Sequence, residues 1–452
     1  MLTLALLSLA SPQLQAAGQP PSIPDGYWNA RLESPGGELP FGIELRRPRG
    51  VDLSETGNEV WTAALINGPE RIEISEAIWL VDADGASENW TLELRFPHYD
   101  SVIRCQTSLE GSILSGEWIK TSGKDKQTRM EFLARYAGSS DPKPLVVNRF
   151  RPRPFPPGAK PLTLAPRYRV QFESSKDPAV GIFKVNEDQS VHATFLTTTG
   201  DYRYLAGNLD AGGLRLSCFD GAHAFLFTAE EAPNRQISSG RVHGGLSNLA
   251  GHFYSRDTWH ESWQAEPDAK IQLPDAWEEV GLKPEAERPD WRRFQATALD
   301  GSSVELGALA KPGQARLLVL FGSWCPNCHD EHRYLKQLYA KYAERGLSIT
   351  SLAFELGGDR DRDLAQLTRY QSAMQLPWPV VLVSDSTDKK LAAQAFPIVD
   401  AVKSYPTTLF IDANGTIRAV HSGFSGPATG EAYERLQRSF EEKIEALFAT
   451  GK

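Results

Sequence analysis

Two of the four cysteines in this chain of 452 residues, Cys325 and Cys328, stand only a Pro-Asn dipeptide apart. Two thiols at this spacing can close a disulfide and open it again, which is the chemistry of thiol–disulfide exchange. The same letters continue into His329, and the resulting CxxCH pattern is also the attachment site of a c-type haem. Together with His332, the group contains side chains that bind zinc. The surrounding elements decide among these three kinds of chemistry.

The two cysteines stand where a strand is expected to pass into a helix. Residues 316–323 are almost continuously apolar, which predicts a buried strand. Residues 326–346 have helical periodicity, with a proline suited to the first turn and a glycine suited to the C-terminal cap. The free N–H groups and the positive end of the helix dipole would stabilise a thiolate at Cys325. Because Cys328 lies one turn further along, we expect Cys325 to attack a disulfide and Cys328 to resolve the mixed disulfide.

This setting resembles a known family, the thioredoxin-fold proteins, and specifically the exported thiol-disulfide oxidoreductases of the TlpA/ResA type. The resemblance covers roughly residues 290–450 and rests on WCPNC between an apolar strand and a helix, and on the stretch YPTT. It implies an α/β thioredoxin-like fold with a redox-active disulfide between Cys325 and Cys328. It also implies that Pro406 is the cis-proline packed against this disulfide, and that Glu331 is the functional glutamate of the subfamily.

Further residues follow from the same resemblance. Val319 stands where thioredoxins proper carry a buried acid, and this departure favours the TlpA/ResA type. Trp324, Tyr405 and Thr407 are expected to contact the substrate. Thr407 would present its backbone to the substrate chain in the manner of a short added strand, whereas Trp324 is either a core aromatic residue or the surface lip of the disulfide. The two histidines of the helix, His329 and His332, are expected to be exposed.

The rival kinds of chemistry fit less well. A haem or zinc site would place the cysteines inside an otherwise complete thioredoxin pattern, and a dithiol requires neither group. Zinc would also need four ligands, of which one short helix supplies Cys325, Cys328 and His332. A peroxiredoxin would carry Thr or Ser three residues before its reactive cysteine, where Gly322 stands. We therefore predict no cofactor and no metal.

Composition narrows the class of protein and its surroundings. Hydrophobic residues make up 41% of the chain and charged residues 23%, as in ordinary globular proteins, and a net charge of −9 without a basic stripe argues against a nucleic-acid partner. Residues 1–24 begin with an apolar run followed by small residues, although no Lys or Arg precedes it. This segment resembles a signal peptide. We therefore expect export to the periplasm or cell envelope, with the N-terminus as a possible membrane tether.

The chain is long enough for several domains. Short runs of alternating apolar and polar residues predict two β-rich, barrel- or sandwich-like units, while alternating strands and helices predict the thioredoxin-like fold after them. The expected order is as follows: a signal-like or disordered N-terminus (1–24), a β-rich unit (25–138), a proline-rich linker (139–166), a second β-rich unit (167–266), a linker (267–292) and a thioredoxin-like domain (293–452).

The β-rich units carry no recognisable catalytic pattern. Their histidines show no metal-ligand spacing, and Cys105 and Cys218 either form a disulfide between the units or are buried thiols, the second being favoured. We expect a recognition or positioning platform, held apart from the redox domain by the proline-rich joints. The protein would then exchange or reduce disulfides of protein substrates and receive electrons from an upstream thiol donor. The alternative is a partner- or surface-binding β protein with an accessory redox domain.

Overall fold

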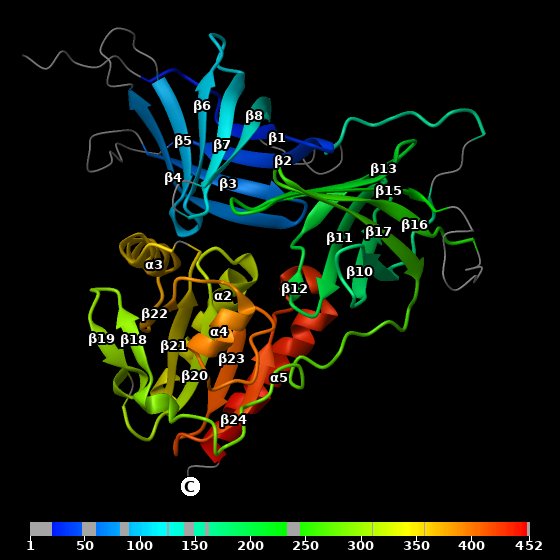
Figure 1. The fold of residues 1–452 in the computed structure, drawn as a ribbon. Coiled ribbons are helices and arrows are strands. Elements are labelled where there is room, and N and C mark those ends of the chain that lie inside the picture. Colours follow the sequence, from blue (N-terminus) through cyan, green and yellow to red (C-terminus); the bar gives the residue numbers. More distant parts are fainter. Residues whose placement is uncertain are drawn as a thin grey trace, which may run out of the picture.

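The computed structural model describes residues 20–47, 60–81, 90–123, 126–139, 149–158, 162–232, 245–309, 311–356 and 358–449. Within these residues the chain forms two β-barrels and a third domain in which helices cover a mixed sheet (Figure 1). The predicted fold class, two β-rich units followed by an α/β thioredoxin-like fold, is confirmed. Of the described helices, none has the length and apolar character needed to cross a membrane.

Barrel 1 is a closed ring of eight antiparallel strands that follow one another in sequence order. Alternate side chains point inward, so that three tryptophans, Trp28, Trp79 and Trp118, are fully buried in its interior. Its strands are β1 (Gly26–Ser34), β2 (Gly37–Arg46), β3 (Val60–Asn67), β4 (Glu70–Val81), β5 (Trp90–Phe96), β6 (Ser101–Thr107), β7 (Ile113–Thr121) and β8 (Gln127–Gly138). A short 3-10 helix, η1 (Pro97–Tyr99), joins β5 to β6.

Barrel 2 also closes, because β10 pairs with both β9 and β11. Aromatic side chains fill its interior, among them Phe195, Phe227 and Trp263, whose rings contact one another. Its strands are β9 (Arg167–Phe172), β10 (Ala179–Val185), β11 (Ser190–Thr197), β13 (Leu205–Asp210), β14 (Gly213–Phe219), β15 (Ala224–Glu231), β16 (Leu249–Ser255) and β17 (Trp259–Pro267), with the two-residue strand β12 (Gly200–Asp201) beside β11.

The third domain, called the redox domain below, has a seven-stranded sheet in the order β19-β18-β22-β21-β20-β23-β24. Strand β20, which leads into the cysteine pair, pairs in parallel with β21 and antiparallel with β23. The strands are β18 (Gln295–Ala298), β19 (Ser303–Glu305), β20 (Ala315–Phe321), β21 (Leu347–Phe354), β22 (Val380–Ser384), β23 (Thr407–Ile411) and β24 (Ile417–Ser422). The helices are α2 (Pro326–Tyr342), α3 (Arg360–Met374), α4 (Lys389–Ala395) and α5 (Glu431–Ala449), with the 3-10 helices η2 (Trp291–Arg293), η3 (Leu306–Leu309), η4 (Ala343–Arg345) and η5 (Pro427–Thr429).

Helix α2 begins where the sequence predicts, but it ends at Tyr342, and a 3-10 turn fills the rest of the predicted helix up to Gly346. Cys325 is its N-cap residue and Pro326 its first residue, a position at which the missing proline N–H costs nothing. The chain leaves through η4 and Gly346, whose φ of 95° lies in the left-handed region that glycine adopts most easily. Leu335 and Leu338 anchor the helix to the sheet, since both are buried in the core.

The expectation that proline-rich joints hold the parts at a distance is wrong. In the described part of the first joint, Arg149 is buried between the barrels and donates hydrogen bonds to the Asn67 side chain (2.8 Å) and the Ser217 hydroxyl (2.9 Å). In the second joint, Trp277 packs against Phe410 and Phe440 of the redox domain. Both joints therefore form part of the packed structure.

The remaining two cysteines are both buried free thiols. Cys105 lies in β6 of barrel 1, and Cys218 lies in β14 of barrel 2. Burial raises the pKa of each thiol above its ordinary value. The favoured interpretation of these residues as small apolar core side chains is confirmed.

Candidate functional site

The redox pair lies at the junction of β20 and α2. The Cys325 sulfur accepts the backbone N–H of Cys328 at 3.3 Å, and both side chains are free thiols in this structure. Cys325 retains 6% of its surface exposure, whereas Cys328 retains none. Burial raises the pKa of Cys328 well above its ordinary value, and the hydrogen bond and charge of Cys325 add to this effect. The two thiols therefore differ in access, since Cys328 is the more deeply buried of the two.

A buried carboxyl group fixes the loop that leads into the pair. Both the N–H and the hydroxyl of Ser323 donate to Glu355, each at 2.8 Å. Burial raises the pKa of Glu355 to about 7, although the bonds from Ser323 oppose the shift. The sequence analysis missed Glu355, because a single glutamate after an apolar strand gives no signal of its own. Gly322 completes the loop, since a side chain there would overlap the indole of Trp324.

The loop before β23 closes over Cys325. The Tyr405–Pro406 peptide bond is cis, as predicted. The Tyr405 carbonyl oxygen lies 3.5 Å from the Cys325 sulfur, and the Tyr405 ring meets the Trp324 ring edge to face at 5.6 Å. Trp324 is half-buried, with its Nε1 donating to the Phe354 carbonyl at 2.9 Å. Trp324 and Tyr405 therefore form a wall beside the Cys325 sulfur.

Thr407 has a different environment from the one expected. It pairs with Leu320 of β20 on one side and with Ser422 of β24 on the other, and it is almost completely buried. Its hydroxyl donates to the Ser404 carbonyl at 2.8 Å. An added strand has no free edge to pair with at this residue, so the expectation that Thr407 presents its backbone to a substrate does not fit this arrangement.

Glu331 is fully buried one turn beyond Cys328. The Thr408 hydroxyl donates to its Oε1 at 2.8 Å, and its Oε2 has no hydrogen-bond partner among the residues that the structure describes. Burial raises the pKa of Glu331 to about 8, although the bond from Thr408 opposes the shift. This carboxyl group therefore changes charge at a pH close to neutral and lies on the same face of α2 as the Cys328 thiol.

The two histidines of α2 are buried, so the expectation that they are exposed is wrong. The His329 Nε2 lies 2.9 Å from the Ser323 carbonyl oxygen, and the His332 Nε2 lies 2.9 Å from the Ser351 hydroxyl. Burial lowers the pKa of His332 to about 3 and that of His329 well below its usual value, so both rings are neutral at pH 7. Helical periodicity did not reveal this, because the rings that pack on His329 come from distant segments, Tyr99 of barrel 1 and Tyr370 of α3.

Barrel 1 contacts the back of the redox helix through η1. The Tyr99 ring stacks on His329 with ring centroids 4.2 Å apart. Gln366 of α3 donates to the Pro97 and His98 carbonyls at 3.1 and 3.0 Å, and Arg362 pairs with Asp100 at 2.8 Å. The turn between β5 and β6 is therefore bonded to the redox domain through both main-chain and charged groups.

Arg203 joins all three parts of the molecule. It belongs to barrel 2, is 3% exposed in its side chain, and pairs with Glu70 of barrel 1 at 2.7 Å and with Asp330 of α2. Asp220 lies 3.7 Å from it on a third side. The Arg203 charge and the bonded His223 hold the pKa of Asp220 well below its ordinary value, even though burial acts in the opposite direction. Charged groups of both barrels therefore fix the first turns of the redox helix.

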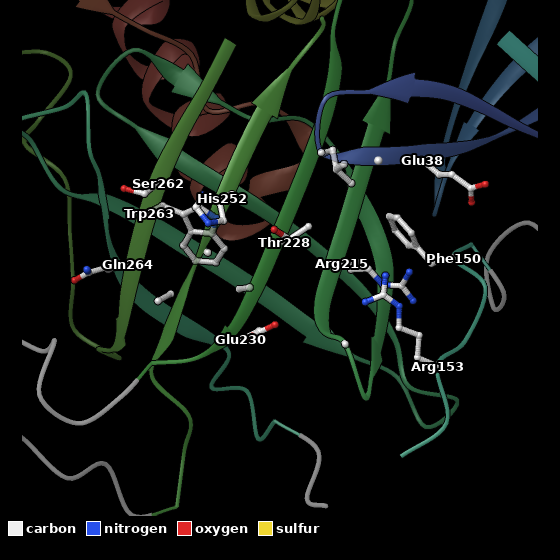
Figure 2. Close-up of a pocket in the computed structure, with 17 residues that line it drawn as sticks. Glu38, Phe150, Arg153, Arg215, Thr228, Glu230, His252, Ser262, Trp263 and Gln264 are labelled. Carbon is white, nitrogen blue, oxygen red and sulfur yellow. The ribbon is translucent and has the colours of Figure 1, made fainter. Parts of the chain in front are cut away.

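Two openings of the molecule differ in their relation to the cysteines. A groove of about 690 Å³ lies where barrel 2 meets the β1–β2 hairpin, and Figure 2 shows Phe150, Arg153 and Arg215 gathered at one side of it. Its lining includes no residue of the redox domain. A cavity of about 520 Å³ at the end of barrel 2 is lined in part by Asn327, which stands between the two cysteines. In the described part of the chain, no group of three or more His, Cys, Asp or Glu side chains is arranged to hold a metal ion.

Comparison with known proteins shows which proteins the redox domain is similar to. A model of the AhpC/TSA family matches residues 288–420. The thiol-disulfide oxidoreductase ResA of Halalkalibacterium halodurans is 29% identical over 132 residues, which cover 29% of this chain and 65% of ResA. The thiol:disulfide interchange protein DsbE of Escherichia coli K12 is 28% identical over 158 residues, which cover 34% of this chain and 70% of DsbE. The chain thus spans slightly less than two thirds of the length of that ResA.

Solved structures give similar coverage. A thiol:disulfide interchange protein of the thioredoxin family from Chlorobium tepidum has 20% sequence identity and a TM-score of 0.26, and the match covers 36% of this chain and 99% of that one. From the sequence comparisons, the C-terminal third is an AhpC/TSA thioredoxin-like domain homologous to the ResA and DsbE thiol-disulfide oxidoreductases. The resemblance predicted from the sequence is confirmed, and the residues matched by the family model do not include the barrels.

Proposed function

We propose that the protein is a thiol-disulfide oxidoreductase of the cell envelope that reduces or exchanges protein disulfides through Cys325 and Cys328. The observation that carries this proposal is the geometry of the pair. Cys325 caps α2 and its sulfur accepts an N–H of the first turn, whereas Cys328 is fully buried one turn further on. The N–H groups at a helix N-terminus stabilise the negative charge of an attacking thiolate.

The reaction proceeds in two exchanges. The Cys325 thiolate attacks one sulfur of the substrate disulfide, so that a Cys325–substrate bond forms and the other substrate sulfur leaves as a thiolate. The Cys328 thiolate then attacks Cys325, which closes the Cys325–Cys328 disulfide and releases the second substrate thiolate. The substrate gains two electrons, the pair loses two, and an upstream dithiol donor restores the pair. Trp324, Tyr405 and Pro406 form the wall against which the substrate sulfur is placed.

Glu331 accepts the proton that Cys328 loses during the second exchange. Cys328 is buried and its pKa is raised, so its thiol needs a nearby base before it can attack. The unpartnered Oε2 of Glu331 is available for this role. Because the pKa of Glu331 is about 8, the carboxyl group is mostly protonated at pH 7 and becomes a competent base as the pH rises through 8.

Replacement of Glu331 by glutamine should therefore slow resolution most strongly above pH 8. We expect the rate at which the Cys325 mixed disulfide decays to rise with pH in the unchanged protein and to be at least about tenfold lower at pH 9 in Glu331→Gln. Stopped-flow mixing of preformed mixed disulfide at pH 6–9 measures this rate. Glu344→Gln, the same substitution in the 3-10 turn that follows this helix, is the matched control. Identical pH profiles in Glu331→Gln and the control would remove Glu331 from the mechanism.

Substrate class and location belong to the same proposal. The relatives named thiol-disulfide oxidoreductase and thiol:disulfide interchange protein support disulfides as substrates. The signal-like residues 1–24 support export, and most of them lie outside the described residues. Because η1 and Arg203 join both barrels to the redox domain, we assign the barrels to the same functional unit.

Reduction of insulin tests the proposed function. With dithiothreitol as the electron donor, the full chain should accelerate precipitation of the insulin B chain well beyond the rate with dithiothreitol alone. The double variant Cys325→Ser/Cys328→Ser should give only the dithiothreitol rate, whereas Cys105→Ser should retain full activity, because Cys105 lies in the core of barrel 1. No acceleration by the unchanged chain would contradict the proposal.

A further inference from the structure

The cavity of about 520 Å³ lies between the open end of barrel 2 and the redox helix. Its walls come from turns that join strands of this barrel and from Asn327 of the redox pair's Pro-Asn dipeptide. The Asn327 side chain rests directly on Gly200, where even a Cβ atom would overlap the Asn327 amide. A ligand that filled the cavity up to Asn327 would contact the first turn of α2, beside the attacking cysteine.

The inner wall of the cavity is aromatic. It is formed by Phe172, Tyr202, Phe225 and Phe253, whose rings contact one another within the barrel. Trp259 stands at the rim and is 48% exposed, although large aromatic side chains are usually covered. An aromatic wall with a few polar groups is the usual construction of a ligand site in the mouth of a β-barrel.

Most charged groups that line the cavity are already satisfied. Arg203 is paired as described above. Asp201 accepts the N–H groups of Arg203 and Gly426. Glu261 accepts the Ser174 N–H at 3.0 Å and the indole N–H of Trp259 at 3.2 Å. These groups hold the cavity together and leave little charge to offer a ligand.

Two charged side chains of the lining have no such partner in the described part of the chain: the exposed carboxylate of Asp177 and the guanidinium of Arg256. The Arg256 backbone N–H donates to the Ala224 carbonyl at 2.9 Å, but its Nε is buried without a hydrogen-bond partner, and no carboxylate in the described part of the chain pairs with its guanidinium. Its φ of 58° holds the main chain in the left-handed region, which costs a residue with a Cβ some energy. Burial lowers the pKa of Lys120 to about 8, and the positive charge of Arg256 adds to this shift.

We propose that this cavity is a subsite for the substrate chain, in which Arg256 binds the carboxylate of an acidic residue close to the disulfide that Cys325 attacks. The inference rests on the proposed function and adds a substrate preference to it. The Arg256 Nε is buried, so a carboxylate in the cavity would accept a charge-assisted hydrogen bond from the terminal N–H groups of the guanidinium. The aromatic wall would contact an apolar side chain next to that acidic residue.

Peptide mixed disulfides test the subsite. Each peptide carries one cysteine bonded to 5-thio-2-nitrobenzoate, one phenylalanine, and either Glu or Gln at a single position two to four residues from the cysteine on either side. Each peptide is mixed with excess reduced protein. The release of thionitrobenzoate from the peptide, followed at 412 nm, gives the rate constant of attack. At one or more positions, Glu should react about tenfold faster than Gln at subsaturating concentration, the size expected for one charge-assisted hydrogen bond.

Variants assign the preference to Arg256. Arg256→Gln should bring the Glu-to-Gln rate ratio close to one, and Arg256→Glu should favour a Lys peptide over the Glu peptide. Arg169→Gln, which removes an arginine half exposed on β9 of the same barrel, should retain the original ratio. Equal rates for Glu and Gln in the unchanged protein, or a ratio that survives Arg256→Gln, would overturn the subsite.

Two further arms separate the possible causes of failure. The mixed disulfide of glutathione with thionitrobenzoate carries carboxylates on a small molecule. If Arg256→Gln slowed the reaction with the glutathione mixed disulfide and with none of the peptides, the peptide subsite would be overturned. Release that persists in Cys325→Ser would instead contradict the proposed function, because attack would then come from another group.

Discussion

Arg203→Met should lower the stability of the protein and make Cys325, at the start of α2, more accessible. The substitution leaves Glu70, Asp220 and Asp330 without the buried cation that they share. Breaking a buried ion pair from one side costs on the order of 3–5 kcal/mol, because a charge remains buried and unpaired. We therefore expect a clearly lower midpoint of denaturation by guanidinium chloride. We also expect faster alkylation of Cys325, since barrel residues help to cover the first turns of α2.

Alkylation with iodoacetamide, followed by mass spectrometry of peptides, measures the second effect at Cys325 itself. Arg169→Met is the control, because Arg169 is half exposed and its pair with Asp268 at 3.3 Å contributes little. Cys328 should remain protected in both variants under native conditions. If Arg203→Met had the denaturation midpoint and the Cys325 alkylation rate of the control, the barrels would not be held to the redox domain by this cluster.

The sequence predicted those features that depend on residues close together in the chain. The apolar strand, the proline at the start of α2, and Gly346 beyond its end place Cys325 at a helix N-terminus through local geometry alone. The two β-rich units followed from their alternating patterns, although pattern alone did not distinguish barrels from sandwiches. The YPTT stretch located the cis-proline through its resemblance to the loop of the thioredoxin-fold family.

Features that depend on contacts between distant segments were not predictable in this way. His329 is buried because Tyr99, far away in the sequence, stacks on it. Glu355 serves the redox loop only because β21 ends beside Ser323. Thr407 has no free edge because β24 returns alongside β23. In each case the deciding neighbour comes from another element, and a single sequence carries no record of that pairing.

Because the barrels pack against the redox domain, a truncated protein without the barrels would have an altered site. A cut near Asp275 would free the redox domain from the groups that cover α2, including Tyr99 and Arg203. It would expose His329 and leave Asp330 without its barrel-2 partner. Activity of such a fragment would therefore report on an altered site, and single substitutions in the full chain separate the contributions of the barrels more cleanly.

The second large effect concerns the redox pair. Cys325→Ser should reduce disulfide exchange by at least ~10³-fold, because the attacking sulfur is removed and its hydroxyl replacement is a poor nucleophile at neutral pH. Cys328→Ser should still attack, since Cys325 is intact, but it should be unable to complete the second exchange. This variant should therefore accumulate a stable mixed disulfide. Cys105 and Cys218 should form no adduct, because both lie in barrel cores.

The most direct test is the mass of the adduct that each variant forms with a disulfide-bonded peptide. The protein is mixed with the peptide, quenched in acid and analysed without reduction. The account predicts one peptide mass on Cys328→Ser, mapped by digestion to Cys325, and no adduct on Cys325→Ser. Equal adducts on the two variants, or an adduct mapped to Cys328 in Cys325→Ser, would show that the two thiols do not have the assigned roles.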